Sequence, residues 1–79
     1  MVKPRDEKYT RKLRDIGKEC RSIREDLGLT QAEVGKAIGY TQRSISDFEC
    51  GKADSALILW YYVDTLVPEW VERALYDRC

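Results

Sequence analysis

Apolar residues recur along the first third of the chain at the spacing of a single helical face. They step by three or four positions through five turns, and charged residues fill the positions between them. The stripe consists of Tyr9, Leu13, Ile16, Cys20, Ile23 and Leu27. Gly28 follows it, and glycine commonly ends a helix. The pattern therefore predicts a first helix over about residues 6–27.

Two shorter helices are predicted next, over about residues 31–38 and 42–50. Thr30, followed by Glu33 three positions later, has the sequence of a capping box, which begins the first of them. Only residues 39–41 lie between the two helices, and a connection this short forces them to cross steeply. We expect both helices to turn their apolar side chains toward a common core.

Three glycines are expected to shape this helix pair. Gly39 and Gly51 follow the two helices, where glycine most often ends a helix. Gly35 lies inside the first helix, where its low helix propensity calls for a packing reason. Close approach of two helices needs a residue with little or no side chain, so Gly35 is expected to face the neighbouring helix.

The last third of the chain predicts two further helices, over about residues 55–66 and 68–77. Either Asp54 or Ser55 caps the first. Pro68 suits the first turn of the second, where its missing N–H does no harm. The helix over 55–66 is apolar nearly all round. Either it is the central core helix, or part of it meets another subunit.

Length and composition indicate one small domain over residues 1–79. No apolar run approaches the roughly 20 residues that a membrane-spanning helix needs. No apolar stretch follows the charged N-terminus, as it would in a secretory signal. We therefore expect a cytoplasmic protein that does not associate with membranes.

Carboxylates are plentiful in the chain, but no motif groups residues for catalysis or metal binding. Cys20, Cys50 and Cys79 lack the spacing of a metal or redox pair, and we interpret them as reduced thiols. The chain has no histidine, which is the usual general base. It also lacks a glycine-rich phosphate loop. We therefore expect no enzyme activity, no metal and no cofactor.

Two stretches of the sequence resemble a known family. Leu27-Gly-Leu-Thr-Gln-Ala-Glu-Val-Gly begins the short helix pair, and Ile38-Gly-Tyr-Thr-Gln-Arg-Ser-Ile-Ser-Asp-Phe-Glu-Cys-Gly-Lys runs through its second helix. Over about residues 13–67 the chain resembles the phage-repressor and Cro-type helix-turn-helix domains, which are also called lambda-repressor-like or XRE family. The resemblance implies an all-α, five-helix bundle with the helix-turn-helix at helices two and three. It also implies sequence-specific binding of double-stranded DNA.

The resemblance assigns roles to individual residues. Positions that match base-reading residues are Gln42, Arg43, Ser46 and Asp47. Positions that match contacts to the DNA backbone are Gln31, Thr41, Ser44 and Lys52. Arg24 and Glu49 match a structural ion pair between the first helix and the end of the third. Asp47 departs from the family pattern: it could accept a hydrogen bond from cytosine, orient Arg43 from four residues away, or repel phosphate.

Charge is balanced overall but unevenly distributed. Fourteen basic and fourteen acidic residues give a net charge of zero. Residues 1–28 carry nine basic and six acidic residues, whereas residues 53–79 carry two basic and five acidic. Non-specific DNA affinity should be low, because it scales with the number of phosphates neutralised. The basic residues in and just before the first helix are either an arm for the DNA backbone or a solvated face: Lys3, Arg5, Lys8, Arg11, Lys12 and Arg14.

Two functions from different classes are compatible with these patterns. The first is a repressor of phage, prophage or mobile-element type. We expect this repressor to be a homodimer, because aromatic residues are enriched in protein interfaces. The aromatic residues that could form its dimer interface, or could instead fill the core, are Trp60, Tyr61, Tyr62 and Trp70. The second is a protein-interaction module, such as an antitoxin or an anti-repressor adaptor, which the zero net charge and the acidic C-terminal part favour.

Overall fold

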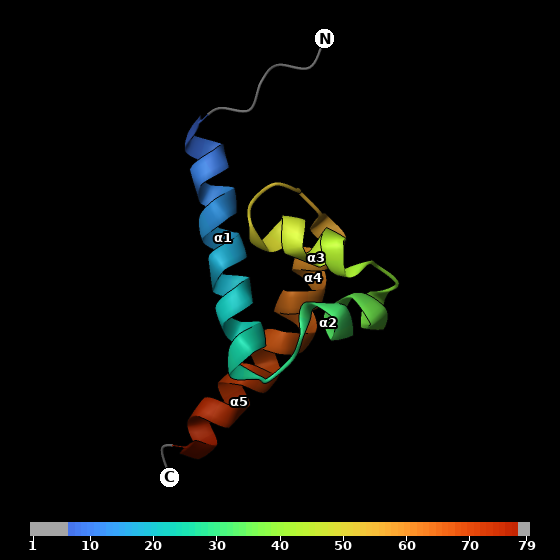
Figure 1. Ribbon diagram of the computed structural model, residues 1–79. Coiled ribbons are helices and arrows are strands. Elements are labelled where there is room, and N and C mark those ends of the chain that lie inside the picture. The colour runs from blue at the N-terminus through green and yellow to red at the C-terminus, as the bar shows by residue number, and fades with distance from the viewer. Residues whose placement is uncertain (1–6, 78–79) are drawn as a thin grey trace.

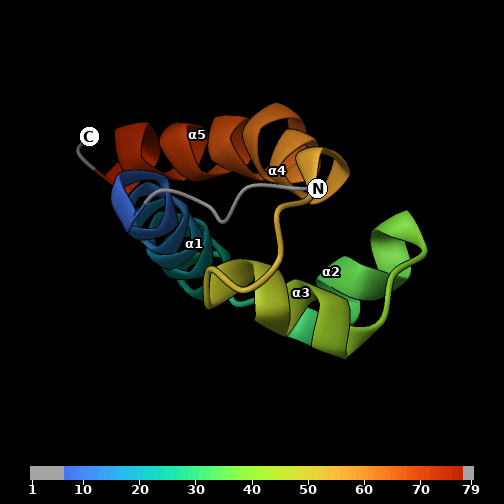
Figure 2. The same ribbon diagram turned by 90° about the horizontal axis from the view of Figure 1, so that it is seen from above.

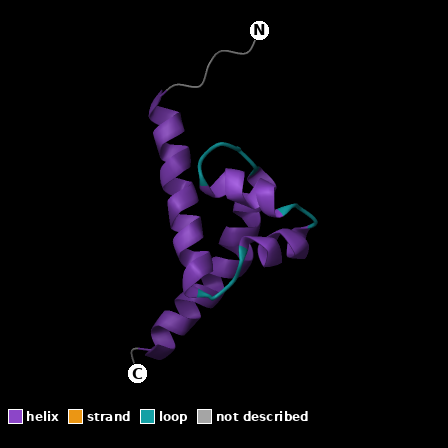
Figure 3. Cartoon of the chain, in the orientation of Figure 1, coloured by secondary structure: helices purple, strands orange, loops and turns teal. Residues whose placement is uncertain are grey.

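The computed structural model describes residues 7–77, and all regular structure within them is helical (Figure 3). The all-α expectation is therefore confirmed. The elements are α1 (Glu7–Asp26), α2 (Gln31–Ile38), α3 (Gln42–Glu49), α4 (Ala56–Tyr61), the π-helical segment η1 (Tyr62–Leu66) and α5 (Val67–Asp77). No helix in the described part of the chain is long and apolar enough to cross a membrane.

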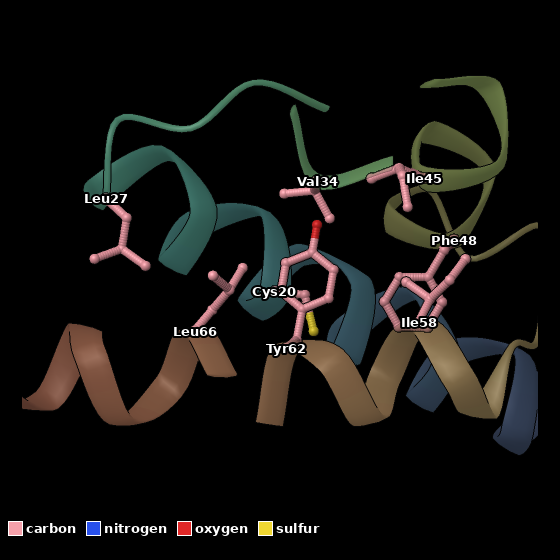
Figure 4. Close-up of a cluster of buried hydrophobic side chains, with 8 residues drawn as sticks. All are labelled: Cys20, Leu27, Val34, Ile45, Phe48, Ile58, Tyr62 and Leu66. Carbon is pink, nitrogen blue, oxygen red and sulfur yellow. The ribbon is translucent and has the colours of Figure 1, made fainter. Parts of the chain in front are cut away.

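The helices surround one small core. α2 and α3 form a tight pair beside α1, and the C-terminal helices pack across the other side of this group (Figures 1 and 2). The core lies where the three parts meet, and Figure 4 shows its side chains pointing inward from every helix up to η1. The buried apolar residues are Cys20, Leu27, Val34, Ile45, Phe48, Ile58, Tyr62 and Leu66.

The predicted ends of α2 are confirmed in atomic detail. The Thr30 hydroxyl accepts a hydrogen bond from the Glu33 backbone N–H at 3.1 Å, and the Glu33 carboxylate accepts one from the Thr30 N–H at 3.1 Å. Gly39 ends the helix in the left-handed conformation with φ 77°. The Tyr40 N–H then donates to the Gly35 carbonyl at 2.8 Å, which satisfies a carbonyl that the helix end leaves free.

Two glycines allow the backbone segments to approach each other closely. A Cβ on Gly35 would lie 2.5 Å from the Tyr40 carbonyl oxygen. Gly35 therefore faces the turn between the two helices, where we had expected it to face a helix. Gly17, in the middle of α1, allows the same kind of close approach between α1 and α3. A Cβ at this position would lie 2.4 Å from the carbonyl oxygen of Glu49. Gly17 thus sets the distance between α1 and the end of α3.

The expected break between the last two helices is wrong. Ser55 caps α4, since its hydroxyl accepts from the Ile58 N–H at 3.3 Å. From there the chain stays helical without interruption to Asp77. The Val67 N–H donates to the Tyr62 carbonyl five residues earlier, which widens the helix by one residue just before Pro68. Proline lacks an N–H and its ring collides with the preceding turn of a regular α-helix, and the wider π-helical turn lies directly before Pro68.

The apolar stripe of α1 is buried only in its second half. Cys20 and Leu27 are buried, whereas Tyr9 is 57% exposed and Ile16 is 39% exposed. Figure 1 shows the reason, because the N-terminal part of α1 extends past the helix pair. The helix start expected near residue 6 lies outside the described residues.

Candidate nucleic-acid interface

The outer face of α3 lies beside a shallow, open hollow. Six of the eight residues expected to contact DNA line it: Gln31, Gln42, Arg43, Ser46, Asp47 and Lys52. They come from the start of α2, from α3 and from the loop that follows α3. Gln42, Arg43 and Lys52 are exposed, while Ser46 and Asp47 are half-buried. The fold therefore gathers residues separated by up to 21 positions onto one accessible surface.

The two remaining residues form the cap of α3. The Thr41 hydroxyl accepts from the Ser44 backbone N–H at 3.1 Å, and the two hydroxyl oxygens lie 3.0 Å apart. This arrangement begins the helix next to Gln42. Their expected contact with the DNA backbone remains a prediction.

The loop after α3 holds Lys52 in a fixed place. The Gly51 N–H donates to the Phe48 carbonyl at 3.1 Å, and the Lys52 N–H donates to the Asp47 carbonyl at 2.8 Å. Gly51 has φ 77°, which glycine adopts without strain. This pair of bonds is the Schellman motif, and it turns the chain so that Lys52 borders the same hollow as α3.

Asp47 forms an ion pair with Arg43. The Arg43 Nε and the Asp47 Oδ2 are 3.9 Å apart across one turn of α3, and the Arg43 side chain is 89% exposed. Of the three roles left open for Asp47, this geometry favours orientation of Arg43.

A buried polar cluster lies behind this surface, and its centre is the expected pair of Arg24 and Glu49. Arg24 Nε donates to Glu49 Oε2 at 2.7 Å, and Nη2 donates to Oε1 at 3.1 Å. Arg24 Nη1 also donates to the Leu29 carbonyl at 2.7 Å. Both side chains are more than nine-tenths buried. The bidentate pair therefore joins α1, the following loop and the end of α3.

Two further members of this cluster were not foreseen. Gln31 Nε2 donates to Glu49 Oε1 at 3.0 Å, and the Tyr62 hydroxyl donates to Glu49 Oε2. A signal for Tyr62 was present, because Ile58, Tyr62 and Leu66 follow one another at intervals of four and so share a helix face. Nothing in the sequence indicated the bond between Gln31 and Glu49.

The cluster changes the proton affinities of its members. Burial raises the pKa of Glu49, but hydrogen bonds from Arg24, Gln31 and Tyr62 outweigh it, so the net pKa is lowered. Burial, reinforced by the bond to Glu49, raises the pKa of Tyr62. The hydrogen bond to Glu49 raises the pKa of Arg24, against the opposing effect of burial. Glu49 and Arg24 are therefore charged at neutral pH, and the tyrosine keeps its proton.

The burial pattern corrects the expected aromatic interface. Tyr62 is fully buried, so it fills the core and cannot meet another subunit. Tyr61 is half-buried against the core, and half-buried Trp70 donates its indole N–H to Asp26 Oδ2 at 2.8 Å. Only Trp60, at 66%, is largely exposed. Other exposed large apolar residues of these helices are Leu57, Val63, Val71, Leu75 and Tyr76.

Comparison with known proteins agrees with this geometry. Residues 21–57 match the family model described as helix-turn-helix. No curated protein and no solved structure matches the chain. The matched segment contains Arg24, the capped α2, the three-residue turn and all of α3. Residues 21–57 are therefore similar to the DNA-binding helix-turn-helix domains of the lambda-repressor-like, or XRE, family.

Proposed function

We propose that this protein is a sequence-specific transcriptional repressor of phage, prophage or mobile-element type, and that it acts in the cytoplasm as a homodimer on double-stranded DNA. The observation that carries the proposal is the hollow beside α3, where residues suited to bases and to phosphates meet on one exposed surface. The buried pair of Arg24 and Glu49 holds α3 rigidly behind that surface.

In this proposal α3 enters the major groove with its N-terminal end foremost, as in other helix-turn-helix proteins. Gln42 can form two hydrogen bonds to adenine, and Arg43 can form two to guanine. Ser46 faces the next bases. Asp47 either faces these bases as well or orients Arg43 through their ion pair. Gln31 and Lys52 contact phosphates on either side of the groove, with help from Thr41 and Ser44.

The homodimer is supported by the outward face of the long C-terminal helix. Leu57, Trp60, Val63, Val71 and Leu75 are each at least 43% exposed. A surface of large apolar side chains on a small domain is a typical interaction site. A stable interface needs about 800 Å² from each partner, and this helix extends from behind α3 to the C-terminal end of the described chain (Figure 1). Two copies would present two recognition helices to a symmetric operator.

Basic residues of α1 could add weak contacts to the DNA backbone. Lys8, Arg11, Lys12 and Arg14 are exposed on the described part of this helix, whereas Lys3 and Arg5 lie outside it. The chain has no net charge, so binding should depend on specific contacts more than on general attraction to phosphates.

The test begins with selection of bound duplexes from a random pool at a stated salt concentration. Gln42→Ala and Arg43→Ala should each weaken binding to the selected duplex by about 5- to 150-fold and leave binding to random DNA unchanged. Lys52→Ala is the matched control, because losing a phosphate contact should weaken both duplexes equally. Equal losses on both duplexes for Gln42→Ala and Arg43→Ala would show that these residues do not read bases.

A second candidate is a protein-interaction module, such as an antitoxin or an anti-repressor adaptor. The exposed apolar residues around Trp60, together with the zero net charge, favour it. Sedimentation at tens of micromolar separates the two proposals. A dimer that binds a selected duplex supports the repressor, whereas a monomer that binds no duplex and co-purifies with another protein supports the module.

A further inference from the structure

The Glu49 carboxylate links the DNA-facing surface to the C-terminal helix. Its Oε2 accepts from Arg24 Nε and from the Tyr62 hydroxyl, and its Oε1 accepts from Arg24 Nη2 and Gln31 Nε2. Each oxygen therefore has two donors, and the donors come from α1, α2 and η1. A carboxylate held in this way has one allowed orientation. That orientation determines where the Gln31 amide must lie in order to donate to Glu49.

Tyr62 can contribute to this orientation because its own position is fixed. The residue is fully buried in the π-helical segment, and its ring stacks on Phe48 with the ring centres 5.8 Å apart. Figure 4 shows the ring standing off the long helix with its hydroxyl pointing across the core toward Val34 of α2. Phenylalanine would fill the same space, so the hydroxyl has a role that packing does not require.

Gln31 lies at the outer end of this chain of hydrogen bonds. It is half-buried and borders the same hollow as Gln42 and Lys52. A glutamine amide has two N–H groups, and one of them donates to Glu49. The other has no partner within residues 7–77. It lies at the start of α2, where backbone N–H groups and the helix dipole also favour an anion.

We infer that Tyr62 is a positioning residue for DNA binding, which acts through Glu49 to hold the Gln31 amide with one N–H ready for a DNA phosphate. The inference rests on the proposed function of the α2–α3 surface. It adds a residue that lies behind that surface, on the opposite side of the core. The order of contacts is Tyr62 to Glu49, Glu49 to Gln31, and Gln31 to phosphate.

The first experiment examines the free protein. The side-chain amide signals of Gln31 are assigned by ¹⁵N NMR in the wild type, in Tyr62→Phe and in Tyr9→Phe, a control on the exposed part of α1. The Gln31 signals should shift in Tyr62→Phe and stay in place in Tyr9→Phe. If Tyr62→Phe is not folded in buffer, the spectra and the binding assays are run in sucrose, which favours the folded state.

The second experiment is a double-mutant cycle on the affinity for the selected duplex. Tyr62→Phe should weaken binding by about threefold to tenfold, as expected for one hydrogen bond. In a Gln31→Ala background it should have no further effect, because the contact it supports is already lost. In an Arg43→Ala background it should retain its full effect, because Arg43 lies outside the cluster.

The outcomes separate this inference from the proposed function. Tyr62→Phe could reduce the affinity for the duplex as much in the Gln31→Ala background as in the wild type, or it could leave the Gln31 amide signals in place. Either result would show that Tyr62 only stabilises the fold and would overturn the inference. Loss of binding in Arg43→Ala with no loss in Tyr62→Phe would overturn the inference alone. A wild-type protein that binds no duplex would overturn the proposed function and the inference together.

Discussion

α3 carries two carboxylates two residues apart, and each faces an arginine in a different environment. Glu49 and Arg24 are 2.7 Å apart, with both side chains more than nine-tenths buried. Asp47 and Arg43 are 3.9 Å apart, with an arginine that is 89% exposed. The first pair joins helices that are distant in sequence, and the second spans one turn of a single helix. The inner pair therefore supports the fold, whereas the outer pair belongs to the surface that we propose reads DNA.

The contrast follows from the cost of burying charge. A buried charge loses its hydration, and removing its partner leaves that loss uncompensated. An exposed pair keeps most of its hydration and contributes little to stability. α3 can therefore be anchored at one end and remain accessible to solvent on its outer face, which is the face that we propose binds DNA.

The largest effect is expected from breaking the inner pair. Arg24→Ala or Glu49→Ala leaves an unpaired buried charge, and each should destabilise the domain by about 3–5 kcal/mol. That is a large share of the total stability of a small domain, which is about 5–15 kcal/mol. Urea unfolding followed by circular dichroism measures the loss. A loss below about 1 kcal/mol would mean that the inner pair behaves like the outer one.

Acid should weaken the same pair reversibly. The pKa of Glu49 is lowered in the folded state, so its contribution to stability is fully present above about pH 4.3, the ordinary glutamate value. It is lost as the pH falls through the lower, folded pKa. Melting temperatures measured from pH 7 to pH 2 should fall more steeply for the wild type than for Glu49→Gln. Parallel curves would argue against this role.

A smaller effect is expected where α1 meets the inner end of α3. Gly17→Ala improves helix propensity, but the new Cβ would lie 2.4 Å from the Glu49 carbonyl oxygen. We expect a net loss of about 1–3 kcal/mol, as for other overpacked sites. Lys18→Ala, on the exposed side of the same helix, is the control and should change stability by less than about 0.5 kcal/mol. A stabilised Gly17→Ala would show that the two backbones can separate at little cost.

The smallest effect on stability is expected from the outer pair. Asp47→Ala should change the free energy of unfolding by less than about 1 kcal/mol. Its effect on DNA affinity depends on the role of the carboxylate. If Asp47 orients Arg43, preference for the selected duplex should fall. If it mainly repels phosphate, affinity should rise on every duplex. Fluorescence anisotropy with selected and random duplexes distinguishes these results.

Much of the helix-turn-helix was predictable, because its determinants are local. The capping box of Thr30 and Glu33 and the glycines at positions 39 and 51 act within a few residues of the helix ends that they define. Arg24 and Glu49 could be paired through the family resemblance. The hollow beside α3 follows from these features, since the short turn leaves the two helices few ways to cross.

The C-terminal helices were less predictable, because the sequence allowed two interpretations. Pro68 is compatible with a new helix and with a π-helical turn, and the choice depends on how Tyr62 and Leu66 pack. The aromatic residues gave the same ambiguity, since a tyrosine suits an interface and also suits a core that offers its hydroxyl a partner. Glu49 is that partner, and it lies 13 positions away.

The sequence by itself determined where α2 and α3 begin and end and which residues face outward from α3, because caps, glycines and helical periodicity act over a few residues. Only the tertiary structure decided that Tyr62 is buried on Glu49, that Gln31 shares the same carboxylate, and that Gly17 must lack a side chain. These features depend on contacts between helices distant in sequence, and a contact of that kind leaves no periodic pattern. The physical reason is the buried charge of Glu49, which requires donors from wherever the folded chain can supply them.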